Sequence, residues 1–165
     1  MPFQENFTLR LSYLVPMNAS RELSHLLENH LPKLQSISEK EWSHKPAPEK
    51  WSKKEILGHL VDSAQNNLRR FIVTQYQQND KIVYVQDDWV KYQGYQEMGS
   101  KEILELWLTL NRQIVRVIDR IPREKMNHTC DTGTNVREFN SLEFLIGDYI
   151  LHLQHHLQQI IILPA

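Results

Sequence analysis

The chain has 165 residues, and its 19 basic and 20 acidic side chains leave a formal net charge of −1. This length fits a single domain over residues 1–165, and the even charge balance excludes a strong field that would attract nucleic acid or an anionic membrane surface. One cysteine excludes an intrachain disulfide, and the lack of a secretory signal and of a bilayer-spanning apolar run predicts a cytoplasmic protein.

Helical periodicity dominates the first half of the chain. Residues 7–13 alternate like a strand, although so short a segment could equally be a leading helical turn. Leucines at helical spacing predict a helix over residues 18–35. The clearest start signal stands at Ser52, because Glu55 follows it at the spacing of a capping box, and this helix is expected to run to about residue 78.

Two further helices complete a predicted all-α fold. The third spans residues 100–121, where Pro122 ends it, and the fourth spans residues 140–161. The connection 79–99 is long enough to cross a bundle, so the second and third helices can run parallel. Loops of this length are often functional, although this one could simply cover one end of the core. Its side chains that suit a pocket wall are Tyr84, Asp87, Asp88, Trp89, Tyr92 and Tyr95.

A histidine pair in the last expected helix indicates a metal site. His152 and His156 lie four residues apart, so both imidazoles point to the same side of the helix and can bind one ion. Helical rotation turns His155 outward to the rim. Asp148 precedes His152 by one turn and could orient its imidazole, or be a surface acid. The pair could instead be hydrogen-bonded core residues.

A third histidine, His59, lies in the second expected helix. The apolar stripe of that helix, which includes Leu57 and Val61, lies nearly opposite His59, so periodicity alone describes a surface histidine. His59 could reach an ion shared with the pair only if another element covers its flank, or if the site lies in an open cleft.

Two motifs resemble the DinB/YfiT-like family. The segment Trp51-Ser-Lys-Lys-Glu-Ile-Leu-Gly-His59-Leu-Val-Asp62-Ser63 is similar to the family's Trp-Ser … His-Leu-x-Asp-Ser opening of the second helix. The segment from His152 to Ile160 is similar to the family's His-x-x-His-His-x-x-Gln-Ile. The likeness covers nearly the whole chain, and one departure is Gln158, where the family often has Gly and where the longer side chain would narrow the approach to the site.

The resemblance implies a four-helix bundle with up-down-down-up connectivity and long connections. It also implies that His59, His152 and His156 bind one divalent metal, with zinc or nickel expected, and leave positions open for water or substrate. The family includes proteins described as metal-dependent hydrolases and resembles thiol-dependent S-transferases and isomerases. The implied function is therefore metal-dependent hydrolysis or thiol S-transfer on a small-molecule substrate, with a low-molecular-weight thiol such as bacillithiol or mycothiol as the expected cosubstrate of the second reaction.

The sequence leaves two alternatives open. A non-enzymatic helical bundle could bind a small molecule or a protein partner and use its histidines structurally. Homodimers are common among such bundles, so a homodimer is an expectation that the sequence does not decide. Asp62 and Asp148 are the nearest candidates for a further acid or base, and each is expected beside the ligands or on the surface.

Overall fold

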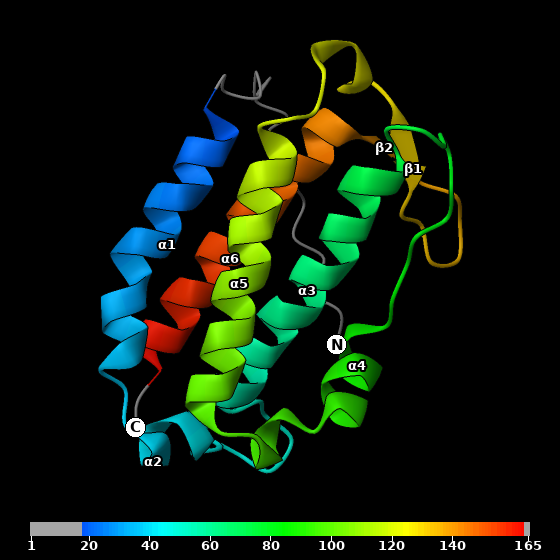
Figure 1. Cartoon of the computed structure of the whole chain (residues 1–165). Helices are drawn as coiled ribbons and strands as arrows, with labels where there is room; N and C mark the ends of the chain where they lie inside the picture. The colour runs from blue at the N-terminus through cyan, green and yellow to red at the C-terminus, as the bar shows by residue number, and fades with distance from the viewer. Residues whose placement is uncertain (1–17, 164–165) are drawn as a thin grey trace.

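A computed structural model describes residues 18–163 and places four long helices side by side in a bundle (Figure 1). The expected strand or turn at residues 7–13 lies outside the described residues. The first and last helices run in one direction and the middle two in the other, which confirms the all-α bundle with up-down-down-up connectivity. The four helices are α1 (Ala19–Gln35), α3 (Lys53–Val73), α5 (Ser100–Ile118) and α6 (Leu142–Ile162).

The connections between these helices contain short elements that periodicity did not predict. The long connection of residues 79–99 is not a bare loop, because it contains a helix and a 3-10 turn. Two short strands pair antiparallel, with Thr129 opposite Ser141. The short elements are α2 (Glu39–Ser43), α4 (Gln86–Gln93), η1 (Tyr95–Glu97), η2 (Arg123–Lys125), β1 (Thr129–Asp131) and β2 (Phe139–Ser141).

Three predicted helix boundaries are wrong. The third long helix ends at Ile118, three residues before the predicted end at 121, and the strand pair explains the other two. The second long helix ends at Val73 instead of continuing to about residue 78. Asn79 takes a left-handed conformation with φ 62° and its backbone N–H donates to the Thr129 carbonyl at 2.6 Å, so the chain turns toward β1. The last helix begins at Leu142 rather than at residue 140, because residues 139–141 pair with β1 and Ser141 caps the helix by accepting from the Phe144 N–H.

The capping box predicted at the start of α3 is confirmed. The Ser52 hydroxyl accepts from the Glu55 N–H at 3.1 Å, and the Glu55 carboxylate accepts from the Ser52 N–H at 2.8 Å. The Lys45 ammonium also bonds to Glu55 at 2.9 Å, which ties the preceding loop to the first turn of the helix. These bonds fix where α3 begins and therefore which of its side chains face each neighbour.

Helix α3 lies at the centre of the molecule. It packs against α5 and α6 on its core side and against α2, α4 and η1 on its other flanks. Because it is covered nearly all round, it buries polar residues as well as apolar ones. None of the helices within residues 18–163 is long and apolar enough to span a bilayer. The largest fully buried side chains around α3 and in the core are Trp42, Phe71, Tyr95, Trp107 and Tyr149.

Candidate metal centre

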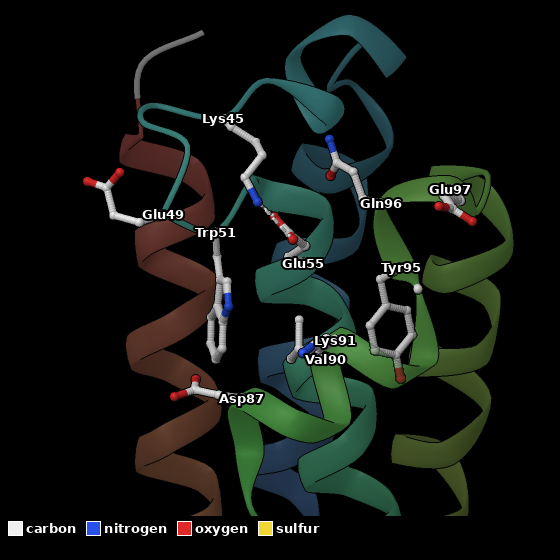
Figure 2. A pocket seen from close by; sticks show the side chains of 11 residues that line it. Lys45, Glu49, Trp51, Glu55, Asp87, Val90, Lys91, Tyr95, Gln96 and Glu97 are labelled. Carbon is white, nitrogen blue, oxygen red and sulfur yellow. Dashed lines mark hydrogen bonds and ion pairs between the residues drawn. The ribbon is translucent and has the colours of Figure 1, made fainter.

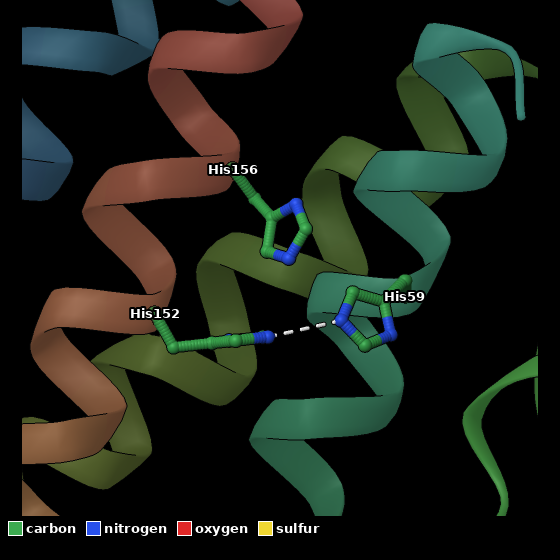
Figure 3. Close-up of side chains that lie close together, drawn as sticks. All are labelled: His59, His152 and His156. Carbon is green, nitrogen blue, oxygen red and sulfur yellow. Dashed lines mark hydrogen bonds between the residues drawn. The ribbon is translucent and has the colours of Figure 1, made fainter. Parts of the chain in front are cut away.

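Three histidines from two helices converge between α3 and α6 (Figure 3). The Nε2 atoms of His59 and His152 face each other at 3.0 Å. The ring centroid of His156 lies 4.9 Å from that of His59 and 4.6 Å from that of His152. One nitrogen from each of the three rings falls within 4.8 Å of the other two. The structure therefore brings together the three residues that the family resemblance named.

The expectation from periodicity that His59 lies on the surface is wrong. Its side chain is only 1% exposed. The Trp51 ring packs on the imidazole with centroids 5.2 Å apart, and the rings of His152 and His156 on α6 lie 5.0 and 4.9 Å from it. The first of the two alternatives left open by the sequence, coverage by another element, is therefore the one that applies.

The three imidazoles are neutral at physiological pH. Burial, with mutual repulsion among the histidines, lowers the pKa of His59 to about 4 and that of His152 to about 3. Burial also lowers the pKa of His156, against the opposing effect of its bond to Gln159. Neutral imidazoles offer lone pairs to a cation without first losing a proton, so the electrostatics of the site favour metal binding.

Gln159 orients one of the three rings. The Nδ1 atom of His156 lies 2.8 Å from the Gln159 Oε1, which can only accept, so the proton stands on Nδ1 and the lone pair on Nε2. His155 is exposed, with its ring centroid 5.1 Å from that of His156, which agrees with its expected place at the rim. Asp148 is exposed and makes no hydrogen bond to His152. Of the two roles expected for it, it is therefore an acid on the surface and does not orient the imidazole.

A buried carboxyl lies one turn beyond His59. Asp62 is fully buried, and its Oδ1 accepts from the Tyr95 hydroxyl at 2.6 Å and from the Gln93 amide at 3.4 Å. Burial raises the pKa of Asp62 to about 6, although both hydrogen bonds favour the carboxylate. Tyr95 reaches this position because Gly58 has no side chain, and a Cβ at Gly58 would overlap the Tyr95 ring.

Two cavities share Trp51 as a wall, and none of the three histidines lines either of them. One has a volume of about 330 Å³ and extends from Trp51 to Tyr95 and Glu97 (Figure 2). The other has a volume of about 500 Å³ and extends from Trp51 to Gln159 and Leu163. Asp87 borders both cavities. Because Trp51 contacts His59 and Gln159 contacts His156, these two side chains connect the larger cavity to the histidine cluster.

The long connection contributes to these walls only in part. Asp87 and Tyr95 line a cavity as the sequence suggested, and Tyr84 packs edge-on against Trp89 with centroids 5.6 Å apart. Tyr92 is 78% exposed and belongs to neither cavity. The sequence alone assigned no role to Gly58 or Gln159. Gln159 was part of the family motif, however, and a glycine next to His59 was a signal that another side chain packs closely on the helix there.

The donor set fits a divalent transition metal. Three imidazoles and no thiolate or carboxylate form the cluster found within residues 18–163. Imidazole suits zinc and nickel, and three protein ligands are typical of catalytic sites because they leave a coordination position open. The histidine cluster between α3 and α6 is therefore the candidate metal centre.

The sequence matches a known protein family, and the fold matches solved structures. The model of the DinB superfamily matches residues 21–160, and no curated protein matches the sequence significantly. YfiT from Bacillus subtilis, described as a probable metal-dependent hydrolase with an unusual four-helix bundle topology, is 17% identical with a TM-score of 0.78, over 87% of this chain and 82% of YfiT.

A second similar fold belongs to the mycothiol-dependent maleylpyruvate isomerase. It is 8% identical to this chain, with a TM-score of 0.72 over 87% of this chain. A mutant of that isomerase matches with a TM-score of 0.71. This chain spans only 59% of the isomerase. At these identities the likenesses to solved structures establish the fold.

Proposed function

Because the chain belongs to the DinB superfamily, we propose that it is a metal-dependent enzyme whose His59, His152 and His156 hold one divalent cation, zinc or nickel. The observation that carries the proposal is the convergence of three neutral imidazoles, with one nitrogen of each within 4.8 Å of the others. A histidine cluster with one buried and two half-buried rings costs stability without a cation, since the rings forgo part of their hydration. Metal binding would offset that cost.

The bound cation would act as a Lewis acid that makes a water molecule or a thiol nucleophilic near neutral pH. The chain's own residues supply the surroundings for this chemistry. Trp51 packs on His59, which is only 1% exposed, and so helps to exclude bulk water from it. Gln159 holds the His156 ring in one orientation. The cavity of about 500 Å³ beside Trp51 lies in the size range of small-molecule sites.

The proposed reaction is nucleophilic attack on a small electrophilic substrate. With water as the nucleophile the protein is a hydrolase, as YfiT is described to be. With a low-molecular-weight thiol such as mycothiol or bacillithiol it is an S-transferase, and a thiol-dependent isomerase shares the fold. Both reactions use the same three histidines and the same adjoining cavity.

Metal analysis tests the site. Purified protein is incubated with excess zinc or nickel, desalted and measured by elemental mass spectrometry. Wild type is expected to retain about one ion per chain, and a His152→Ala/His156→Ala variant is expected to retain almost none. His155→Ala is the matched control, because His155 is a neighbouring but exposed histidine of the same helix. Well below one ion in metal-replete wild type would contradict the proposal.

Turnover assays separate the two reactions. A panel of esters, amides and alkylating electrophiles is offered to the metal-loaded protein with and without bacillithiol or mycothiol. Consumption that requires the thiol identifies the S-transferase, and consumption in its absence identifies the hydrolase. No turnover in either arm, together with unchanged thermal stability after chelation, would favour the non-enzymatic binding bundle instead.

A further inference from the structure

Three buried polar atoms at the metal centre lack a hydrogen-bond partner among residues 18–163. They are the Nδ1 of His59, the Nδ1 of His152 and the Oδ2 of Asp62. An unpaired polar group inside a protein costs roughly 1–3 kcal/mol, so such atoms are rare and call for a partner. The two of these atoms that lie on α3, from His59 and Asp62, are complementary, because an imidazole nitrogen can donate a proton and a carboxylate oxygen accepts one.

Their placement on α3 brings them to the same flank. Asp62 follows His59 by three residues, and side chains at this spacing are neighbours on a helix surface. The Nε2 of His59 faces His152, and Figure 3 shows the other ring nitrogen turned away from α6. On that same side Asp62 receives the Tyr95 hydroxyl from η1, through Oδ1 alone. Oδ2 is therefore the oxygen left for His59.

We propose that Asp62 is a positioning residue of the metal centre whose Oδ2, which makes no direct bond to His59 in the structure, accepts the Nδ1–H of His59 through one bound water molecule. This inference rests on the proposed function and deepens it. A hydrogen bond at Nδ1 determines the tautomer, so the proton stands on Nδ1 and the lone pair on Nε2 points into the histidine cluster. Asp62 would do for His59 what Gln159 does for His156.

The surroundings hold Asp62 in place for this role. The Tyr95 hydroxyl donates to it at 2.6 Å, and Tyr95 itself is only 2% exposed and packs over Gly58. The Gln93 amide donates to the same oxygen at 3.4 Å. Through Tyr95 and Asp62, the segment of α4 and η1 would therefore help to orient His59.

Zinc affinity of the full-length protein, measured by competition with a chromophoric chelator, tests the proposal. Asp62→Ala is expected to weaken zinc binding about 10- to 100-fold, the effect usual for loss of a partner of a ligating histidine. Asp62→Asn keeps the shape and one acceptor oxygen, so a smaller loss is expected. Asn67→Ala is the matched control, because Asn67 is a buried polar residue of α3 that bonds to Ser63 and Arg70. Its zinc affinity should equal that of wild type.

A spectroscopic readout separates positioning from general destabilisation. In zinc-loaded wild type, proton NMR should show a slowly exchanging imidazole N–H resonance that His59→Gln removes. Asp62→Ala should lose or shift this resonance, and Asn67→Ala should keep it. If Asp62→Ala does not fold, Tyr95→Phe replaces it, because it frees the carboxylate without removing it and should broaden the same resonance.

The possible outcomes distinguish the two proposals. Wild type that binds no zinc overturns the proposed function and this inference with it. Wild type that binds zinc, with an Asp62→Ala variant that keeps both the affinity and the resonance, overturns only the role of Asp62. Loss of affinity in Asp62→Ala and in Asn67→Ala alike would show a merely structural effect and also overturn it.

Discussion

Replacing Gly58 with alanine should destabilise the protein even though alanine is the better helix former. Gly58 lies within α3, and a Cβ there would overlap the ring of buried Tyr95. Overpacking of this kind costs roughly 1–3 kcal/mol. A shifted Tyr95 would also give up its 2.6 Å hydrogen bond to Asp62, for about 1–3 kcal/mol more. The helix-propensity gain offsets only about 1 kcal/mol, which leaves a net loss of about 1–5 kcal/mol.

The same substitution at Gly147 is the matched control. Gly147 lies inside α6, and a Cβ there would meet nothing within 4 Å. Gly147→Ala should therefore stabilise by up to about 1 kcal/mol, from helix propensity alone. Urea unfolding of both variants and wild type, followed by circular dichroism, gives the two free-energy differences. A Gly58→Ala variant as stable as Gly147→Ala would refute the argument that Tyr95 packs on an obligatory glycine.

Three further outcomes are expected. Ser52→Ala removes the cap of α3 and the bond to Gln96 and should lower the free energy of unfolding by about 1–2 kcal/mol in urea; a change near zero would contradict this. Gln159→Leu removes the hydrogen-bond acceptor of His156 and should weaken zinc binding about tenfold or more, measured by chelator competition. An unchanged zinc affinity would show that Gln159 does not orient His156. Burial lowers the pKa of His59 from 6.5 to about 4, so as the pH falls through this window the unfolded chain binds a proton that the folded chain does not, and stability is lost. In metal-free protein the stability advantage of wild type over His59→Gln should accordingly shrink by about 2 kcal/mol between about pH 7.5 and about pH 5, and an advantage that does not depend on pH would contradict it.

Local signals in the sequence identified the main helices but not the short ones. The capping box at Ser52 predicted the start of α3 correctly, because its two hydrogen bonds span only three residues. The same signal stands at Ser38 and Glu41, where it starts the short helix α2. Five residues are too few to show a periodic apolar stripe, so α2 is recognised only by its cap. The strands β1 and β2 depend on each other and have no local signature of comparable strength.

The sequence by itself determined the pair His152 and His156, because residues four apart on one helix face the same way whatever surrounds them. Only the tertiary structure decided the burial of His59, since Trp51 and the histidines of α6, the nearer of them 93 positions along the chain, pack against a flank that periodicity described as outward. The bond between Tyr95 and Asp62 likewise joins residues 33 positions apart. Helical periodicity shows which face of a helix is apolar. Contacts between elements distant in the sequence decide which polar side chains of the same helix are buried.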